Sequence, residues 1–195
     1  MLDLKGRSRV APVVDPIAAG LGKIGFTPAS VTIIGLLITI AGSVLIAVGW
    51  LAVGAGVAGF GVALDALDGP LARSKGTASL RGAFLDTMSD RIGEISVWVG
   101  LGIYLRLEPF WLLLCLLALA FSLLIPYVRA RAESWGAEGR GGWMGRAERM
   151  ILALIGIGIA EWWPPALNVM LVVMVVLTAF TVAQRVRRTW QQLPG

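Results

Sequence analysis

Six apolar stretches follow one another along the chain, separated by short segments that are polar or contain proline. They cover about residues 29–48, 51–72, 83–105, 109–131, 148–162 and 165–184. A transmembrane α-helix needs roughly 20 predominantly apolar residues. The connections GW, RLEP and EWWPP leave room only for a reversal of direction, and the last two contain proline, which ends helices. The pattern predicts an all-α integral membrane protein with six transmembrane helices, each antiparallel to the next.

The N-terminal segment differs from these stretches. Residues 11–24 are less apolar and include Asp15 and Lys23, which favours an amphipathic helix lying in the membrane interface. We therefore expect a single membrane domain over residues 1–195. Its N-terminal segment, 1–27, is cytoplasmic and interfacial, and its six-helix bundle covers 28–188.

The composition agrees with a membrane protein and limits the available chemistry. Apolar residues make up 57% of the chain, charged residues 15%, and the mean hydropathy is +0.80. The chain has no histidine, and Cys115 is its only cysteine. Acid–base or metal chemistry must therefore rest on carboxylates.

The distribution of basic residues predicts the orientation. Of the 17 lysines and arginines, only Arg106 falls on the opposite side of the predicted bundle from the rest. The positive-inside rule then places both termini on the cytoplasmic side. The formal charge of +5 fits contact with anionic lipid headgroups. Nucleic acid is not an expected partner, because the chain offers no soluble module to read it.

Four aspartates are concentrated in one stretch, DALDGPLARSKGTASLRGAFLDTMSD, at residues 65–90. Asp65 and Asp68 are three residues apart, and Asp86 and Asp90 are four apart, so each pair can share one helix face. If the intervening turn folds the two helices together, all four carboxylates converge at the cytoplasmic end of the bundle. Such carboxylates repel one another, and hard oxygen ligands without histidine or cysteine suit Mg²⁺ or Mn²⁺. Four of them can hold two ions about 4 Å apart.

Two other interpretations of this stretch stay open at this point. The aspartates can pair with Arg73, Arg81 and Arg91 as interfacial acids. They can also line the permeation path of a divalent-cation transporter, which belongs to another class of protein. A transporter needs a continuous polar path to the far side, whereas the second and third stretches are apolar beyond the aspartates.

The same stretch resembles the signature of the CDP-alcohol phosphotransferase family, D-x-x-D-G-x-x-A-R, eight residues, then G-x-x-x-D-x-x-x-D. The chain matches it throughout, and the match consists of Asp65, Asp68, Gly69, Ala72, Arg73, the eight residues SKGTASLR, Gly82, Asp86 and Asp90. The resemblance implies a cytoplasm-facing membrane enzyme with two metal ions. Such an enzyme moves a phosphatidyl group from CDP-diacylglycerol to an alcohol and releases CMP.

The resemblance also implies roles for individual residues. Asp65, Asp68 and Asp86 would bind one metal ion, and Asp65, Asp86 and Asp90 would bind the second. Asp90 would also be the base that takes the proton of the acceptor hydroxyl. The residues expected to contact the CDP-lipid are Ala29, Ser30, Val31, Thr32, Gly69, Arg73 and Ser79. Many relatives have asparagine where this chain has Ala29, which weakens the assignment of that contact.

The acceptor must be inferred from other cytoplasmic groups. Residues 125–151 and 183–190 resemble the actinobacterial branch of the family, the phosphatidylinositol phosphate synthases, whose acceptor is an inositol phosphate. Guanidinium groups bind phosphate bidentately, and we expect Arg129, Arg149 and Arg185 to contact the acceptor phosphate. The reserve candidates are Arg131, Arg146 and Arg188. The alternative is a phosphatidylglycerophosphate synthase, whose glycerol 3-phosphate is also anionic. The family resemblance implies a homodimer.

Overall fold

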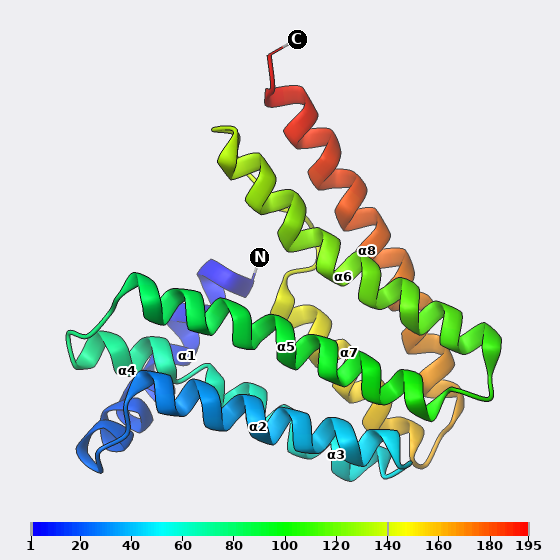
Figure 1. Cartoon of the computed structure of the whole chain (residues 1–195), viewed down its shortest axis with the longest axis horizontal. Helices are drawn as coiled ribbons and strands as arrows, with labels where there is room; N and C mark the ends of the chain where they lie inside the picture. Colours follow the sequence, from blue (N-terminus) through cyan, green and yellow to red (C-terminus); the bar gives the residue numbers. More distant parts are fainter. Residues whose placement is uncertain (1, 140, 195) are drawn as a thin grey trace.

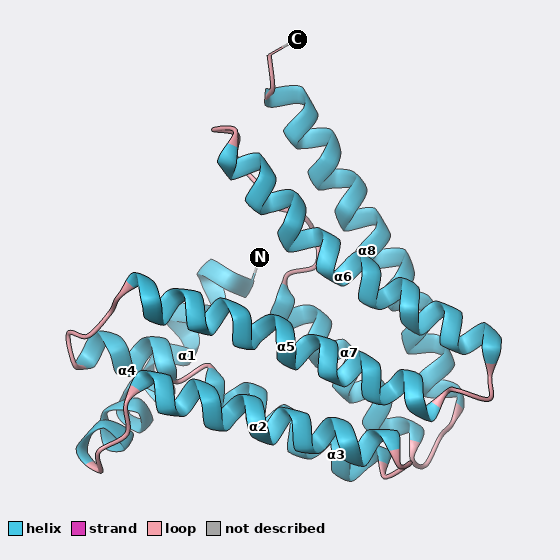
Figure 2. Ribbon diagram, viewed as in Figure 1, coloured by secondary structure: helices cyan, strands magenta, loops and turns pink. Residues whose placement is uncertain are grey.

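The computed structural model describes residues 2–139 and 141–194, which form helices and connecting loops (Figure 2). The predicted all-α class is confirmed. The helices are α1 (Leu2–Lys23), α2 (Pro28–Ala47), α3 (Leu51–Asp65), α4 (Asp68–Ser74), α5 (Leu80–Tyr104), α6 (Pro109–Ser134), α7 (Arg146–Ala160) and α8 (Pro165–Gln192).

The described part of the chain contains four helical stretches that are long and apolar enough to cross a membrane. They are Pro28–Ala47, Leu51–Ser74, Pro109–Ser134 and Pro165–Gln192. The protein is therefore an integral membrane protein with several spanning helices. The two other predicted spans, α5 and α7, do not meet both conditions of length and apolar character. Helix α5 has 25 residues but carries several charges in its first half, and α7 has only 15 residues.

The first two spans form a tightly packed hairpin. Helix α2 begins at a capping box in which Thr27 and Ser30 exchange side-chain and backbone hydrogen bonds, with Pro28 in the first turn. The chain then reverses at Gly49, whose φ of +95° is the left-handed conformation that glycine adopts readily. Further along the hairpin, a Cβ atom added to Gly61 would lie 2.6 Å from the carbonyl oxygen of Gly35. Glycines thus let the two helix backbones touch, as the glycine-rich stretch in the sequence predicts.

Helices α5 to α8 lie to one side of this hairpin, with α5 and α7 beside it and α6 and α8 beyond them (Figure 1). Helix α2 packs against both α3 and α5, α7 packs against α3 and α8, and α6 runs beside α8. One apolar core joins them, with Trp98, Ile157 and Met174 among its fully buried side chains. Helix α1 packs against α4, where Ala18, Val31 and Leu71 form a smaller apolar cluster.

The second predicted span contains a break that the sequence pattern did not reveal. Helix α3 ends at Asp65 and α4 begins at Asp68, and the turn between them has a hydrogen bond from the Leu67 amide to the Leu64 carbonyl at 3.0 Å. The prediction that Asp65 and Asp68 share one face of a continuous helix was therefore wrong. The two residues instead lie on either side of a turn.

Candidate active site

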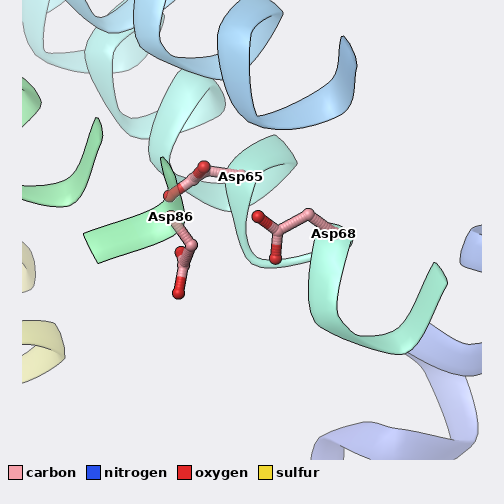
Figure 3. A group of neighbouring side chains, drawn as sticks. All are labelled: Asp65, Asp68 and Asp86. Carbon is pink, nitrogen blue, oxygen red and sulfur yellow. The ribbon is translucent and has the colours of Figure 1, made fainter. Parts of the chain in front are cut away.

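Three of the four signature aspartates meet where α3, α4 and α5 come together. Asp65 ends α3, Asp68 begins α4, and Asp86 lies in the second turn of α5. One carboxylate oxygen from each lies within 4.8 Å of those from the other two. Figure 3 shows the three side chains projecting toward a shared space from these different elements. The predicted convergence of the two aspartate pairs is therefore present for these three residues.

Asp90 lies beside this group and contacts two arginines. Arg146 Nη1 contacts Asp90 Oδ1 and lies 3.9 Å from Asp65 Oδ2. Arg91 Nη2 lies 3.9 Å from Asp90 Oδ2. The structure thus brings all four aspartates together, and two guanidinium groups reach the group on its Asp90 side.

The donor set fits a hard divalent cation. Asp65 is only 6% exposed, and its buried Oδ1 has no hydrogen-bond partner within the described ranges. In the same ranges no lysine or arginine forms an ion pair with Asp68 or Asp86. Four clustered carboxylates that are only partly balanced by Arg146 and Arg91 are costly, and a bound cation with oxygen ligands reduces that cost. The aspartates therefore fit Mg²⁺ or Mn²⁺.

The TPASVT segment at the start of α2 contacts the aspartates through one residue. The Thr32 hydroxyl lies 2.5 Å from Asp68 Oδ2 and 3.0 Å from the Pro28 carbonyl. Its single proton goes to the closer and charged acceptor, so Thr32 orients a candidate metal ligand. Sequence reasoning expected Thr32 to contact the CDP-lipid and missed this hydrogen bond.

The other residues predicted to contact the CDP-lipid lie in different settings. Ser30 belongs to the α2 capping box, and Val31 is buried in the small cluster next to α1. Ser79 is the N-cap of α5 and accepts a hydrogen bond from the Gly82 amide at 3.1 Å. Gly69 lies beside Arg73, whose Nη1 would be 3.5 Å from a Cβ atom at position 69. Ala29 is exposed at the start of α2. Their contacts with a lipid stay predictions.

The three arginines predicted for the acceptor lie near one another, although they come from three helices. The positive charge of Arg185 on α8 interacts with the positive charges of Arg129 on α6 and Arg149 on α7. Arg129 Nε donates to Glu133 Oε1 at 2.8 Å. Arg185 donates to the carbonyl oxygens of Gly141 and Ile125, at 2.9 and 3.0 Å.

Arg149 is in a different environment from the other two. It is 2% exposed, and its Nε and Nη2 atoms donate to the two oxygens of Glu94 at 2.8 and 3.0 Å. Glu94 itself is fully buried and also accepts from Arg91 Nη1 at 2.8 Å. Sequence reasoning did not single out Glu94. The spacing of Glu94 indicates that it lies on the same helix face as Asp86 and Asp90, because the three acids follow one another at intervals of four residues.

The fold and the aspartate cluster define a class of membrane-embedded transferase. The family model described as CDP-alcohol phosphatidyltransferase matches residues 26–183. This chain belongs to that family, which confirms the resemblance inferred from the signature.

Two members of this family are similar to the chain over nearly its whole length. The phosphatidylinositol phosphate synthase of Mycobacterium marinum is 40% identical over 200 residues, which cover 97% of this chain and 84% of that protein. The protein of the same name from Mycobacterium tuberculosis is 38% identical over 203 residues, which cover 100% of this chain and 93% of that protein.

Solved structures of the M. tuberculosis enzyme share the fold. The crystal structure with CDP-DAG bound has a TM-score of 0.87 at 38% identity, covering 94% of this chain and 96% of that chain. The structure in complex with manganese and citrate also has a TM-score of 0.87, covering 94% and 91%.

Proposed function

We propose that this chain transfers the phosphatidyl group of CDP-diacylglycerol to an inositol phosphate, giving phosphatidylinositol phosphate and CMP. The observation that carries the proposal is the neighbourhood of two groups of opposite charge. Asp65, Asp68 and Asp86 can hold cations at a diphosphate. Arg149 lies one turn after Arg146, which contacts Asp90, so it is close to the aspartates and can hold an anionic acceptor. The names of the M. marinum and M. tuberculosis relatives support this choice of acceptor.

The aspartates would hold two divalent ions at the donor. Asp65, Asp68 and Asp86 are the ligands proposed for one ion, and Asp65, Asp86 and Asp90 for the second. Mg²⁺ or Mn²⁺ bound there would neutralise charge on the phosphate oxygens of the donor. The manganese in the structure of the M. tuberculosis relative supports this type of ion. Thr32 keeps the Asp68 carboxylate in one orientation through its hydroxyl.

The CDP-lipid itself would contact the residues around the cluster. Gly69 has no side chain to block the approach of the nucleotide, and Arg73 beside it would contact the diphosphate. The further contacts proposed are Ala29, Ser30, Val31, Thr32 and Ser79. The CDP-DAG bound to the M. tuberculosis relative supports this donor.

Asp90 is the proposed general base. Its carboxylate takes the proton of the acceptor hydroxyl, whose oxygen attacks the phosphorus atom that bears the diacylglycerol. The bond from that phosphorus to the bridging oxygen of the diphosphate breaks, and CMP leaves. Positioning supplies much of the acceleration in such a displacement. Arg146 contacts Asp90 and can limit the orientations of its carboxylate.

Arg129, Arg149 and Arg185 would bind the phosphate of the acceptor. An anionic acceptor is the chemical reason for placing three guanidinium groups from different helices near one another. Arg131, Arg146 and Arg188 remain reserve candidates, although Arg146 has the contact with Asp90 and Arg131 stacks on the Trp135 ring at 4.4 Å.

The proposed arrangement in the membrane has six crossings, with α5 and α7 added to the four stretches described above. A single domain over 1–195 would include an N-terminal segment, 1–27, with an interfacial amphipathic helix, and a bundle over 28–188. Both termini and the active site would face the cytoplasm, according to the positive-inside rule.

Accessibility of cysteines introduced near Lys75 and Arg106 to a membrane-impermeant reagent would test the orientation. Sedimentation in detergent would test the homodimer.

The acceptor can be tested directly with the purified protein. CMP release from CDP-diacylglycerol is measured with Mg²⁺ or Mn²⁺ and with inositol phosphate, free inositol or glycerol 3-phosphate as the acceptor. We expect turnover with inositol phosphate, little with free inositol, and none after chelation of the metal. Turnover with glycerol 3-phosphate alone would mean that the protein is a phosphatidylglycerophosphate synthase. Metal uptake into vesicles without CMP release would instead support the transporter.

A further inference from the structure

We propose that Glu94 is a positioning residue for the acceptor: it fixes Arg149 in the orientation that receives the acceptor phosphate. The inference rests on the proposed function, because it assumes that Arg149 binds a phosphorylated acceptor. It starts from a buried carboxylate next to the four aspartates that is not one of the signature residues.

The hydrogen bonds of Glu94 make it unsuited to metal binding. Its two oxygens accept three charge-assisted hydrogen bonds, two from Arg149 and one from Arg91, at 2.8–3.0 Å. By contrast, Asp86, two turns earlier on the same helix, has no ion pair within the described ranges. Glu94 is therefore an internal counter-ion for arginines rather than a fifth metal ligand.

Glu94 and Asp90 form two successive bridges between α5 and α7. Asp90 contacts Arg146, and Glu94, one turn further along α5, binds Arg149, one turn further along α7. The two arginines are three residues apart, so both lie on one side of the first turn of α7. Arg146 therefore contacts the aspartate cluster through Asp90, and Arg149 contacts Glu94 in the next turn of α5.

The bond pattern leaves part of the Arg149 guanidinium available for a ligand. Its Nε and Nη2 atoms are committed to Glu94, and Nη1 makes no hydrogen bond within the part of the chain that the structure describes. Arg149 also lies close enough to Arg185 for their charges to interact. A guanidinium held along one edge keeps its other donors in a fixed direction, which reduces the cost of ordering it around a phosphate.

The negative charge of Glu94 also lowers the cost of burying the positive charges of Arg91 and Arg149. Arg91 and Arg149 are both largely withdrawn from water. Arg91 has a second partner in Asp90 at 3.9 Å. Among the described residues, Arg149 has only Glu94, which it shares with Arg91, so its positive charge is offset in part. The remaining positive charge is available to an anionic acceptor. A neutral residue at position 94 would leave Arg149 both uncompensated and free to turn.

The experiment compares Glu94→Gln, Glu94→Asp, Arg149→Ala and the double variant E94Q/R149A with the wild-type protein. The matched control is Glu161→Gln, which makes the same chemical change at a carboxylate that accepts from the Ala52 amide near the opposite end of α7. CMP release gives separate KM values for CDP-diacylglycerol and for the phosphorylated acceptor, and thermal unfolding in detergent is measured for every variant.

We expect Glu94→Gln to raise the acceptor KM about tenfold or more and to change the KM for CDP-diacylglycerol less than about twofold. Glu94→Asp should recover part of the loss, because it keeps the charge. In the Arg149→Ala background, Glu94→Gln should raise the acceptor KM no further, since both changes remove the same interaction. A contribution confined to stability lowers the active fraction, and therefore the apparent kcat, while it leaves both KM values unchanged; that result, or additive effects in the double variant, would overturn the inference.

Failure of this inference and failure of the proposed function give different results. If the wild-type protein uses glycerol 3-phosphate, the proposed acceptor is wrong, and the Glu94 variants are then measured with glycerol 3-phosphate. If inositol phosphate is the acceptor and Glu94→Gln leaves its KM unchanged, the function stands and the role of Glu94 is wrong. Should Glu94→Gln fail to fold, Glu94→Asp keeps the test available, because it retains the charge but draws the carboxylate back from Arg149 by one methylene, and it must then raise the acceptor KM selectively.

Discussion

The aspartate group and the arginine group differ in how their charges are balanced. Asp68 and Asp86 have no ion-pair partner in the described ranges, and Asp65 has a buried oxygen without a hydrogen bond. The acceptor arginines, in contrast, each donate to a carboxylate or to backbone carbonyls. The aspartates therefore fit a bound cation, whereas the protein holds the arginines in place before any ligand binds.

The two groups also differ in their origin along the chain. The aspartates lie within 26 residues on consecutive helices, while the arginines come from α6, α7 and α8. The aspartate group depends on a local turn and the arginine group on long-range packing. Substitutions of the aspartates should therefore act mainly on the chemical step and on metal binding. Substitutions of Arg129, Arg149 and Arg185 should act on the affinity for the acceptor.

The largest expected effect is that of Asp90→Asn. Removing the proposed base should lower kcat about 10²- to 10⁴-fold, because the amide cannot take the proton of the acceptor hydroxyl. The variant is compared with the wild-type protein in CMP release and in binding of CDP-diacylglycerol, which should be largely spared. Activity close to wild type would remove Asp90 from the role of base.

An intermediate effect is expected for Arg149→Ala in the arginine group. The acceptor KM should rise by about tenfold or more with the donor KM nearly unchanged, because a charge-assisted contact with the phosphate is lost. The variant also leaves Glu94 with only Arg91 as a partner, so thermal unfolding should shift to lower temperature. A selective loss of affinity for CDP-diacylglycerol would place Arg149 at the donor and break the comparison between the two groups.

The smallest effect is expected for Thr32→Val. It removes the hydroxyl that lies 2.5 Å from Asp68 Oδ2 while keeping the shape of the side chain. A group that orients a metal ligand typically contributes about tenfold to metal affinity. The half-saturating Mn²⁺ concentration should rise by about this factor in the CMP assay.

A matched threonine provides the control for that variant. The Thr178 hydroxyl on α8 donates to the Met174 carbonyl of its own helix. Thr178→Val should leave the Mn²⁺ dependence unchanged. Equal shifts in the two variants would show that Thr32 has no particular role in orienting Asp68.

Much of the fold followed from the hydrophobic pattern, because membrane helices depend mainly on a local property, the length of an apolar run. The pattern placed the starts of α2, α3, α6 and α8 within one residue of their observed positions. It overlooked the interruption at Ala66 and Leu67, since both residues are apolar and neither breaks helices. After the interruption, α4 packs against α1 and α2, and this packing is not visible in the hydrophobic pattern.

The sequence by itself determined the type of membrane protein, the family and the ligand chemistry of the aspartates. Their spacing is short enough for one turn to bring them together, and without histidine only carboxylates were available. The tertiary structure decided which acid neutralises which arginine. Glu94 and Arg149 are 55 residues apart, and no spacing rule joins them. Their pairing depends on how α7 packs within the bundle, and in a buried place each charge must find a partner.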